Sequence, residues 1–209
     1  MTKRPDVDDA YAMQSADEVR DLYRTWSHSY DAVFGDGQGY QLHAEVAMAF
    51  VGAGGQGPVL DVGAGTGLVA EVLKRLNTGP VDGIDLSEDM LIMAQGKGVY
   101  RTVSAVDVTQ PLTLRDAPYA GIVSAGTFTL GHVGPEAMNN LLSVAAPGAL
   151  FVLSINAAHY AAAGFEGAVA GLSGQITDVT HRDVRIYDDR ADEAHRDDMA
   201  RLLIFRKAA

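Results

Sequence analysis

The stretch that decides the fold is Val59-Leu60-Asp61-Val62-Gly63-Ala64-Gly65-Thr66-Gly67. Its first four residues form a short, mainly apolar run after Pro58, which predicts a buried β-strand. Glycines at alternate positions then predict a tight turn, and apolar residues follow it at helical spacing, at positions 68, 69, 72, 73 and 76. We therefore expect strand, glycine turn, helix. Such a turn lets a ligand lie against bare backbone, and the start of the helix offers N–H groups without intrahelical partners.

A second predicted strand, Val81-Asp82-Gly83-Ile84-Asp85, ends in a carboxylate 22 positions after Gly63. That spacing suits one β-α-β step with an acid placed to accept hydrogen bonds from a ribose. The dinucleotide fingerprint is G-x-G-x-x-G. Here the third glycine comes one residue earlier, and Asp61 lies two residues before the first. A carboxylate there is unfavourable beside a pyrophosphate but favourable beside an ammonium group, so the pattern favours a cationic nucleoside without phosphate.

At these residues the sequence resembles the class I S-adenosylmethionine-dependent methyltransferases, whose first motif is similar to the run from Asp61 to Gly67. The resemblance covers about residues 19–207. The segment 22–31 is similar to the W-x-x-x-Y-D segment of small-molecule methyltransferases, especially the methyltransferase-like group that includes the Williams–Beuren region protein. The resemblance implies an α/β fold: a Rossmann-like, seven-stranded, mostly parallel sheet with an antiparallel last strand and an N-terminal helical lid.

The resemblance also implies the cofactor S-adenosyl-L-methionine. The residues expected to bind it are Asp61, Gly63, Ala64, Gly65, Gly67, Asp85, Leu86, Met90, Asp107, Val108, Ala125 and Tyr30. Among them, Asp85 is expected to accept both ribose hydroxyls, and a hydrogen bond to a charged group contributes roughly 1.5–3 kcal/mol. Asp107 is expected to accept the adenine amino group, with a solvated turn aspartate as the alternative. For Met90 the alternative is core packing.

The expected acceptor pocket contains Tyr23, Trp26, Phe128 and His132. Tyr23, Trp26 and Tyr30 recur at helical spacing, which fits either core packing or a lid over the cofactor. Methyl transfer mainly requires alignment of acceptor, methyl and sulfur, and an amine or alcohol acceptor must also lose a proton. His132 is the best candidate base, and a structural or substrate-contacting histidine is the alternative. The histidines show no metal-ligand spacing, so no metal is expected.

We expect a single methyltransferase domain over residues 1–209, in four parts: N-terminal helices and lid (1–57), cofactor-binding core (58–155), insert (156–175) and C-terminal strand hairpin (176–209). Within the core, strands are expected at 99–106, 119–124 and 150–155. One helix is expected to begin after Ser87, which is a suitable N-cap, and another at about 135–146. A partly helical insert is one alternative, but its glycines favour a loose segment that shapes the acceptor pocket or forms a plain surface excursion. Ala120 departs from the family's Y-D-x-V pattern, which puts the buttressing of that strand end in doubt.

Composition and net charge limit the classes of substrate and partner that the chain is expected to bind. The net charge is −11, from 16 basic and 27 acidic residues, which disfavours a nucleic-acid substrate. No cysteine is present, so disulfides and thiol catalysis are excluded. No apolar run reaches the roughly 20 residues of a membrane helix, and no signal-peptide core opens the chain, so we expect a cytoplasmic protein without a membrane partner. We expect an enzyme with a small-molecule acceptor. A nicotinamide- or nucleotide-binding oxidoreductase, or a non-catalytic cofactor-binding protein, remains the alternative.

Overall fold

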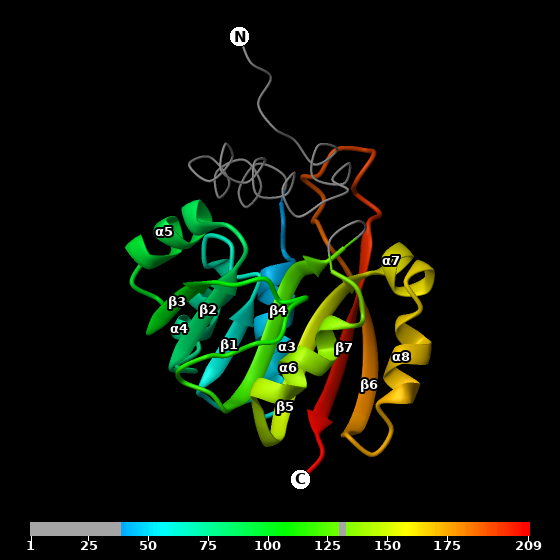
Figure 1. Cartoon of the computed structure of the whole chain (residues 1–209). Helices are drawn as coiled ribbons and strands as arrows, with labels where there is room; N and C mark the ends of the chain where they lie inside the picture. Colours follow the sequence, from blue (N-terminus) through cyan, green and yellow to red (C-terminus); the bar gives the residue numbers. More distant parts are fainter. Residues whose placement is uncertain (1–38, 130–132) are drawn as a thin grey trace.

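A computed structural model of the chain describes residues 39–129 and 133–209 (Figure 1). They form one seven-stranded sheet in the order β3-β2-β1-β4-β5-β7-β6, in which β7 runs antiparallel to the other six strands. The predicted Rossmann-like, mostly parallel sheet is confirmed, whereas residues 1–38 of the predicted N-terminal lid lie outside the described residues. The strands are β1 (Val59–Val62), β2 (Val81–Asp85), β3 (Thr102–Ala105), β4 (Tyr119–Phe128), β5 (Ala145–Asn156), β6 (Ile176–Arg185) and β7 (Met199–Lys207).

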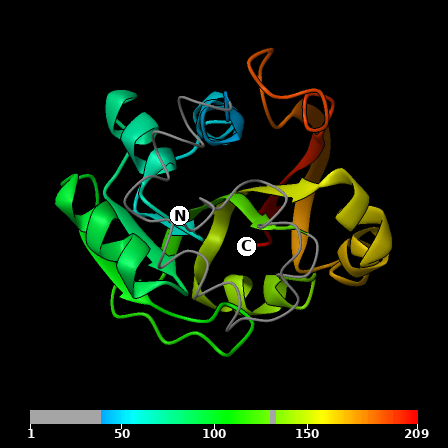
Figure 2. The ribbon, with the colours of Figure 1, turned by 90° about the horizontal axis from the view of Figure 1, so that it is seen from above.

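Helices cover both faces of the sheet. They are α3 (Leu42–Gly52), α4 (Leu68–Arg75), α5 (Glu88–Gly96), α6 (Ala137–Val144), α7 (Ala157–Ala162) and α8 (Phe165–Gly171). Figure 2 shows α3 and α4 on one side of the sheet and α6 on the other. One hydrophobic cluster lies under α3 and α4, and a second joins the sheet to α6, α7 and α8. Val59 belongs to the first cluster and Leu60 to the second, so strand alternation places Asp61 on the α3/α4 face.

Local sequence signals explain the two helices nearest the glycine turn. Gly67, with φ of +95°, is the N-cap of α4, a left-handed conformation that favours glycine. Ser87 caps α5, because its Oγ accepts the Met90 N–H at 3.3 Å, as the sequence predicted. Glu88 and Asp89 place negative charge in the first turn of α5, where the helix dipole favours it.

The insert 156–175 is more ordered than its glycines predicted, because it contains α7 and α8. The side chain of Asn156 accepts the N–H groups of Ala158 and His159 and so caps α7. Phe165, fully buried, fixes α8 against the second cluster. Capping and one buried aromatic residue outweigh the low helix propensity of glycine here. The expectation of a loose segment was wrong.

The C-terminal hairpin was predicted correctly, since β6 pairs antiparallel with β7. The expected strand spans 99–106, 119–124 and 150–155 differ from the observed ones: β3 is shorter, and β4 and β5 are longer. Among the described residues, no helix has the length and apolar character needed to cross a membrane.

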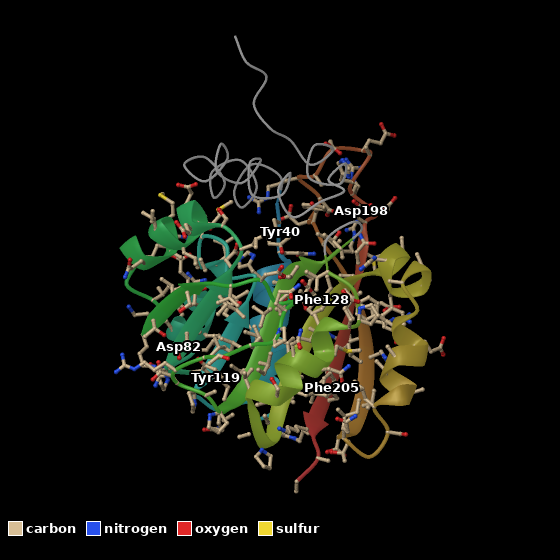
Figure 3. All side chains as sticks on the ribbon, in the orientation of Figure 1. Tyr40, Asp82, Tyr119, Phe128, Asp198 and Phe205 are labelled. Atoms are coloured by element: carbon tan, nitrogen blue, oxygen red, sulfur yellow. The ribbon has the colours of Figure 1, made fainter. Side chains whose placement is uncertain are left out.

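The start of β4 is held by Asp82, a buried carboxylate near the N-terminal end of β2, although position 120 has alanine in place of the expected acid. Asp82 accepts hydrogen bonds from the Arg101 guanidinium, the Thr102 N–H at 3.1 Å and the Tyr119 hydroxyl at 3.0 Å. Burial raises the pKa of Asp82, but these donors outweigh it and lower the pKa. Asp82 and Tyr119 lie together at the lower left of Figure 3. The start of β4 is therefore buttressed through Tyr119 rather than through an acid at position 120.

Candidate functional site

The site forms where β1 and β4 end, at the point where the strand order reverses. Ligands of open α/β sheets bind at such a switch point, outside the carboxyl ends of the strands. The Val62 carbonyl, last in β1, accepts the Ser124 hydroxyl at 2.8 Å and the Thr127 hydroxyl at 2.9 Å. A Cβ on Gly63 would lie 1.8 Å from the Thr127 Oγ1. Glycine at 63 therefore lets β4 cross close to the turn.

The turn presents bare backbone on its open side. Gly65 has φ of +52°, and a Cβ there would meet no atom within 4 Å. The N–H groups of Gly63 and Ala64 both donate to the Ile84 carbonyl, at 2.8 and 3.0 Å, which fixes the turn on the end of β2. The absence of a side chain at 65 thus leaves a free surface above a firmly held turn.

Asp85 connects the turn to the start of α5. Its Oδ2 accepts the Gly65 N–H and its Oδ1 accepts the Ser87 N–H, both at 2.8 Å. Burial raises the pKa of Asp85, and the N–H donors of Ser87, Gly65 and Leu86 oppose the rise. Each carboxylate oxygen has two lone pairs, so each keeps acceptor capacity for a ligand hydroxyl. Asp85 can therefore order the turn and receive a diol at once.

A cavity of about 300 Å³, including its open mouth, lies against the turn. It is lined by Tyr40, His43, Gly63, Ala64, Gly65, Thr66, Leu68, Val69 and Ala125. The structure thus brings together four of the predicted cofactor residues, from the turn and from β4. Polar side chains are contributed by Thr66 of the turn and by Tyr40 and His43 at the start of α3.

Tyr40 and His43 were not predicted at the site. Their rings stack, with centroids 5.5 Å apart and planes 19° apart, and Tyr40 lies in the upper part of Figure 3. Tyr40 also makes an isolated β-bridge to Tyr187, which fixes the chain entering α3. Their spacing of three residues was the available signal, because at the start of a helix it puts both rings on one face. In the sequence, His43 was one of several histidines without a common spacing, so nothing singled it out.

Asp61 lies below the turn and is not among the residues that line the cavity. The side chain is 0% exposed, and its Oδ2 accepts the Tyr100 hydroxyl at 2.7 Å. Within the part of the chain described, its Oδ1 has no hydrogen-bond partner. Burial raises the pKa of Asp61 to about 7; the Tyr100 hydrogen bond opposes the rise, and the Asp85 charge adds to it. A direct contact between Asp61 and a cofactor stays a prediction.

The other predicted residues fall into two groups. Met90 and Phe128 are almost or fully buried, at 1% and 0% exposed, and Phe128 packs edge-on against Phe165. These placements favour core roles. Asp107 accepts the Thr109 N–H and hydroxyl in a local turn, and its backbone neighbour Val108 is held through its carbonyl by Asn140.

Leu86 is half-buried beside Asp85. The roles of Leu86, Met90, Asp107, Val108 and Phe128 stay predictions. The predicted residues Tyr23, Trp26, Tyr30 and His132 lie outside the described residues. Within residues 39–129 and 133–209, no three histidine, aspartate or glutamate side chains gather as metal ligands.

Comparison with known proteins gives the class of fold. Residues 59–148 match a family model described as a methyltransferase domain. Magnesium protoporphyrin IX methyltransferase from Synechocystis PCC 6803, solved with bound SAH, superposes with a TM-score of 0.65 at 19% identity, over 92% of this chain and 99% of that one. The N-methyltransferase NodS from Bradyrhizobium japonicum WM9, in complex with S-adenosyl-L-homocysteine, gives 0.60 at 17% identity, over 80% and 86%. The fold is that of the class I methyltransferases.

The sequence similarity is more local. Human methyltransferase-like protein 27 is 34% identical over 97 residues, which are 46% of this chain and 39% of that protein. The predicted resemblance to the methyltransferase-like group is thereby confirmed, over about two fifths of that relative's length. The fold also occurs in the [4+2]-cyclase SpnF, with a TM-score of 0.67 at 18% identity, over 94% of this chain and 98% of that one. Fold alone therefore does not fix the reaction.

Proposed function

We propose that this protein is a methyltransferase that uses S-adenosyl-L-methionine and transfers its methyl group to oxygen or nitrogen of a small-molecule acceptor. The observation that carries the proposal is the bare turn at Gly65, with the Asp85 carboxylate fixed at its edge and the Asp61 carboxylate buried beneath it. Asp61 and Asp85 place two carboxylates next to the turn, and His43 is the one basic side chain among the described residues that line the cavity. These surroundings suit a positively charged nucleoside better than a pyrophosphate.

The residues fit the parts of this cofactor. Asp85 would accept the ribose hydroxyls with the lone pairs that Gly65 and Ser87 leave. The backbone of Gly63 and Ala64, with Ala125 opposite, would hold the methionine end in the cavity. Tyr40 and His43 would close the side of the cavity formed by α3. Asp107 and Leu86 would contact the adenine.

When bound, the cofactor supplies a methyl group activated by positively charged sulfur. The protein then has to orient the acceptor and exclude water, and such positioning contributes roughly 7–11 kcal/mol. For an alcohol or amine, a base must also take up the acceptor proton, and His132 is the residue proposed for it. Replacement of His132 by Ala should reduce turnover more than cofactor affinity. Unchanged turnover with an identified acceptor would remove His132 from the mechanism.

The proposal is tested by calorimetry on the full chain with S-adenosylhomocysteine and, separately, with NAD. Binding of S-adenosylhomocysteine without NAD binding supports it, whereas binding of NAD alone would establish the oxidoreductase alternative. A screen of phenols, carboxylic acids, amines and alcohols for release of S-adenosylhomocysteine then tests turnover. Cofactor binding without turnover on any acceptor would favour a non-catalytic protein or, as in the cyclase neighbour, a different reaction.

A further inference from the structure

The side chain of Tyr100 occupies an unusual position between the glycine turn and β2. A Cβ on Gly83 would lie 3.0 Å from a Tyr100 ring carbon and 3.0 Å from the Ala64 Cβ, and a Cβ on Gly67 would lie 3.1 Å from the same ring. Glycine at 67 and 83 therefore makes room for the ring. The ring is directed so that its hydroxyl reaches the Asp61 Oδ2 at 2.7 Å.

The hydrogen bond leaves Asp61 only half satisfied. Its Oδ1 is buried and, among the described residues, has no donor. A buried carboxylate with one free oxygen is costly when ionised and unpaired, because the apolar surroundings replace its hydration. A proton on Asp61 removes that cost, and a cation bound nearby removes it in another way. The two are therefore alternatives.

We propose that Tyr100 and Asp61 form a buried pair beneath the glycine turn whose protonation is linked to cofactor binding: Asp61 releases its proton to solvent when the positively charged ammonium group of the cofactor binds. The inference rests on the proposed function. The pair acts through the turn, since Asp61 does not line the cavity. Tyr100 is a positioning residue: its hydroxyl stabilises the ionised carboxylate and holds it under the turn. The raised pKa of Asp61, about 7, agrees with a proton poised to leave.

Other titratable groups face this region. Asp85 lies at the end of β2, and its charge raises the pKa of both Asp61 and Tyr100. Glu71 on α4 also acts on Tyr100 and is itself paired with Lys97 at 3.2 Å. His43 lines the cavity from α3. Because these groups remain in an Asp61 variant, the difference between wild type and variant isolates the contribution of Asp61.

The experiment is calorimetry with S-adenosylhomocysteine at pH 5.5 to 7.2 in buffers of different ionisation enthalpy, which counts protons released on binding. Below about pH 7.2 the α-amino group of the ligand stays mostly charged. Wild type should release on the order of half a proton or more near pH 6.5, and Asp61→Asn should release markedly less. Wild-type affinity should rise with pH by up to about tenfold per unit.

Tyr100→Phe keeps the ring and removes the hydroxyl, and Tyr119→Phe is its matched control because that hydroxyl serves Asp82 instead. Tyr100→Phe should weaken binding roughly tenfold at pH 6.5, since it removes one hydrogen bond to a charged group. It should also raise the pH at which the affinity for S-adenosylhomocysteine increases. Tyr119→Phe should leave binding and its pH profile unchanged. Equal proton release by wild type and Asp61→Asn, or an unshifted pH profile in Tyr100→Phe, would overturn the pair while S-adenosylhomocysteine binding still supports the proposed function. Failure of wild type to bind it would overturn both.

Discussion

Asp61 and Asp82 lie on neighbouring strands of one sheet, are 0% and 2% exposed, and have opposite surroundings. Asp82 accepts hydrogen bonds from three residues, including the Arg101 guanidinium, and its pKa is lowered. Asp61 accepts one hydrogen bond, from Tyr100, and its pKa is raised to about 7. Burial acts on both, so the difference comes from the donors. A fully paired buried acid stabilises the fold, and a partly paired one keeps capacity for a ligand.

Their positions along the strands match this division. Asp82 is the second residue of β2, at the end of the sheet away from the site, whereas Asp61 is followed within two residues by the glycine turn. Three consecutive residues serve both acids: Tyr100 donates to Asp61, and Arg101 and Thr102 donate to Asp82. The segment entering β3 therefore anchors the fold through Arg101 and Thr102 and supports the candidate site through Tyr100.

The largest expected effect comes from Asp82→Ala. Removal of one partner from a buried, hydrogen-bonded ion pair costs about 3–5 kcal/mol, and the partly exposed Arg101 side chain places this case near 3 kcal/mol. The loss should appear in urea unfolding at pH 7. The control is Asp183→Ala, which breaks the exposed pair with Arg201 and should cost under about 1 kcal/mol. Equal losses in the two variants would remove the structural role assigned to Asp82.

Asp61 should give the next effect, visible as a pH dependence of stability. Its folded pKa, about 7, lies above the ordinary value of 3.8, so the native state holds the proton more tightly. Its contribution to stability is therefore complete below pH 3.8 and is lost as pH rises through 7. Between pH 5.5 and 7 this amounts to about 1.6 kcal/mol, because the slope of up to 1.36 kcal/mol per pH unit falls to half at pH 7. The free energy of unfolding of Asp61→Asn should lack that fall, measured by urea titration at each pH.

The Asp82 variant provides the contrast for that experiment. Because the pKa of Asp82 is lowered, its contribution is present above pH 3.8 and is lost only as pH falls below it. The difference between wild type and Asp82→Ala should therefore stay constant from pH 5.5 to 7. A parallel pH dependence in both variants would show that the two aspartates do not differ in the way their surroundings indicate.

Asp85 extends the comparison to a third acid whose partners are backbone N–H groups. Asp85→Ala should weaken S-adenosylhomocysteine binding at least tenfold, about 1.4 kcal/mol, since it removes the ribose acceptor and releases the Gly65 and Ser87 N–H groups. Calorimetry at pH 7 measures it. The control is Asp183→Ala, which removes a carboxylate paired with Arg201 on β6 and β7 and should leave binding unchanged. An unchanged dissociation constant for Asp85→Ala would refute the placement of the ribose.

The sequence predicted the parts of this molecule that depend on local pattern. The strand, glycine turn and helix from Val59 onward, the Ser87 cap and the final hairpin each follow from spacing and residue type, and each was confirmed. The insert was misjudged because its order comes from the Asn156 cap and the burial of Phe165 against a distant cluster. Propensity sums do not contain such tertiary contacts.

Within the candidate site, the sequence identified the residues of the turn and Asp85 but not the groups that the fold brings to them. Tyr100 is 39 positions from Asp61, and Tyr40 and His43 enter the cavity from a helix before the first strand. No periodic pattern joins these positions, because their contacts follow from strand order. The surroundings of Asp61 were equally hidden: its side chain is fully buried beneath the turn and does not line the cavity.

The smallest expected effect separates the two acids most directly. Tyr119→Phe removes one of the donors to Asp82 and leaves Arg101 and Thr102 in place. The free energy of unfolding should therefore fall by about 1 kcal/mol, the net contribution of one hydrogen bond. Among the described residues, Tyr100 is the one side-chain donor to Asp61, so Tyr100→Phe should instead raise the pKa of that carboxyl further. Urea unfolding of both variants across pH 5.5 to 7 tests this. A steeper pH dependence in Tyr100→Phe, with none added in Tyr119→Phe, is expected, and the reverse pattern would contradict the assignment of one acid to the fold and the other to the site.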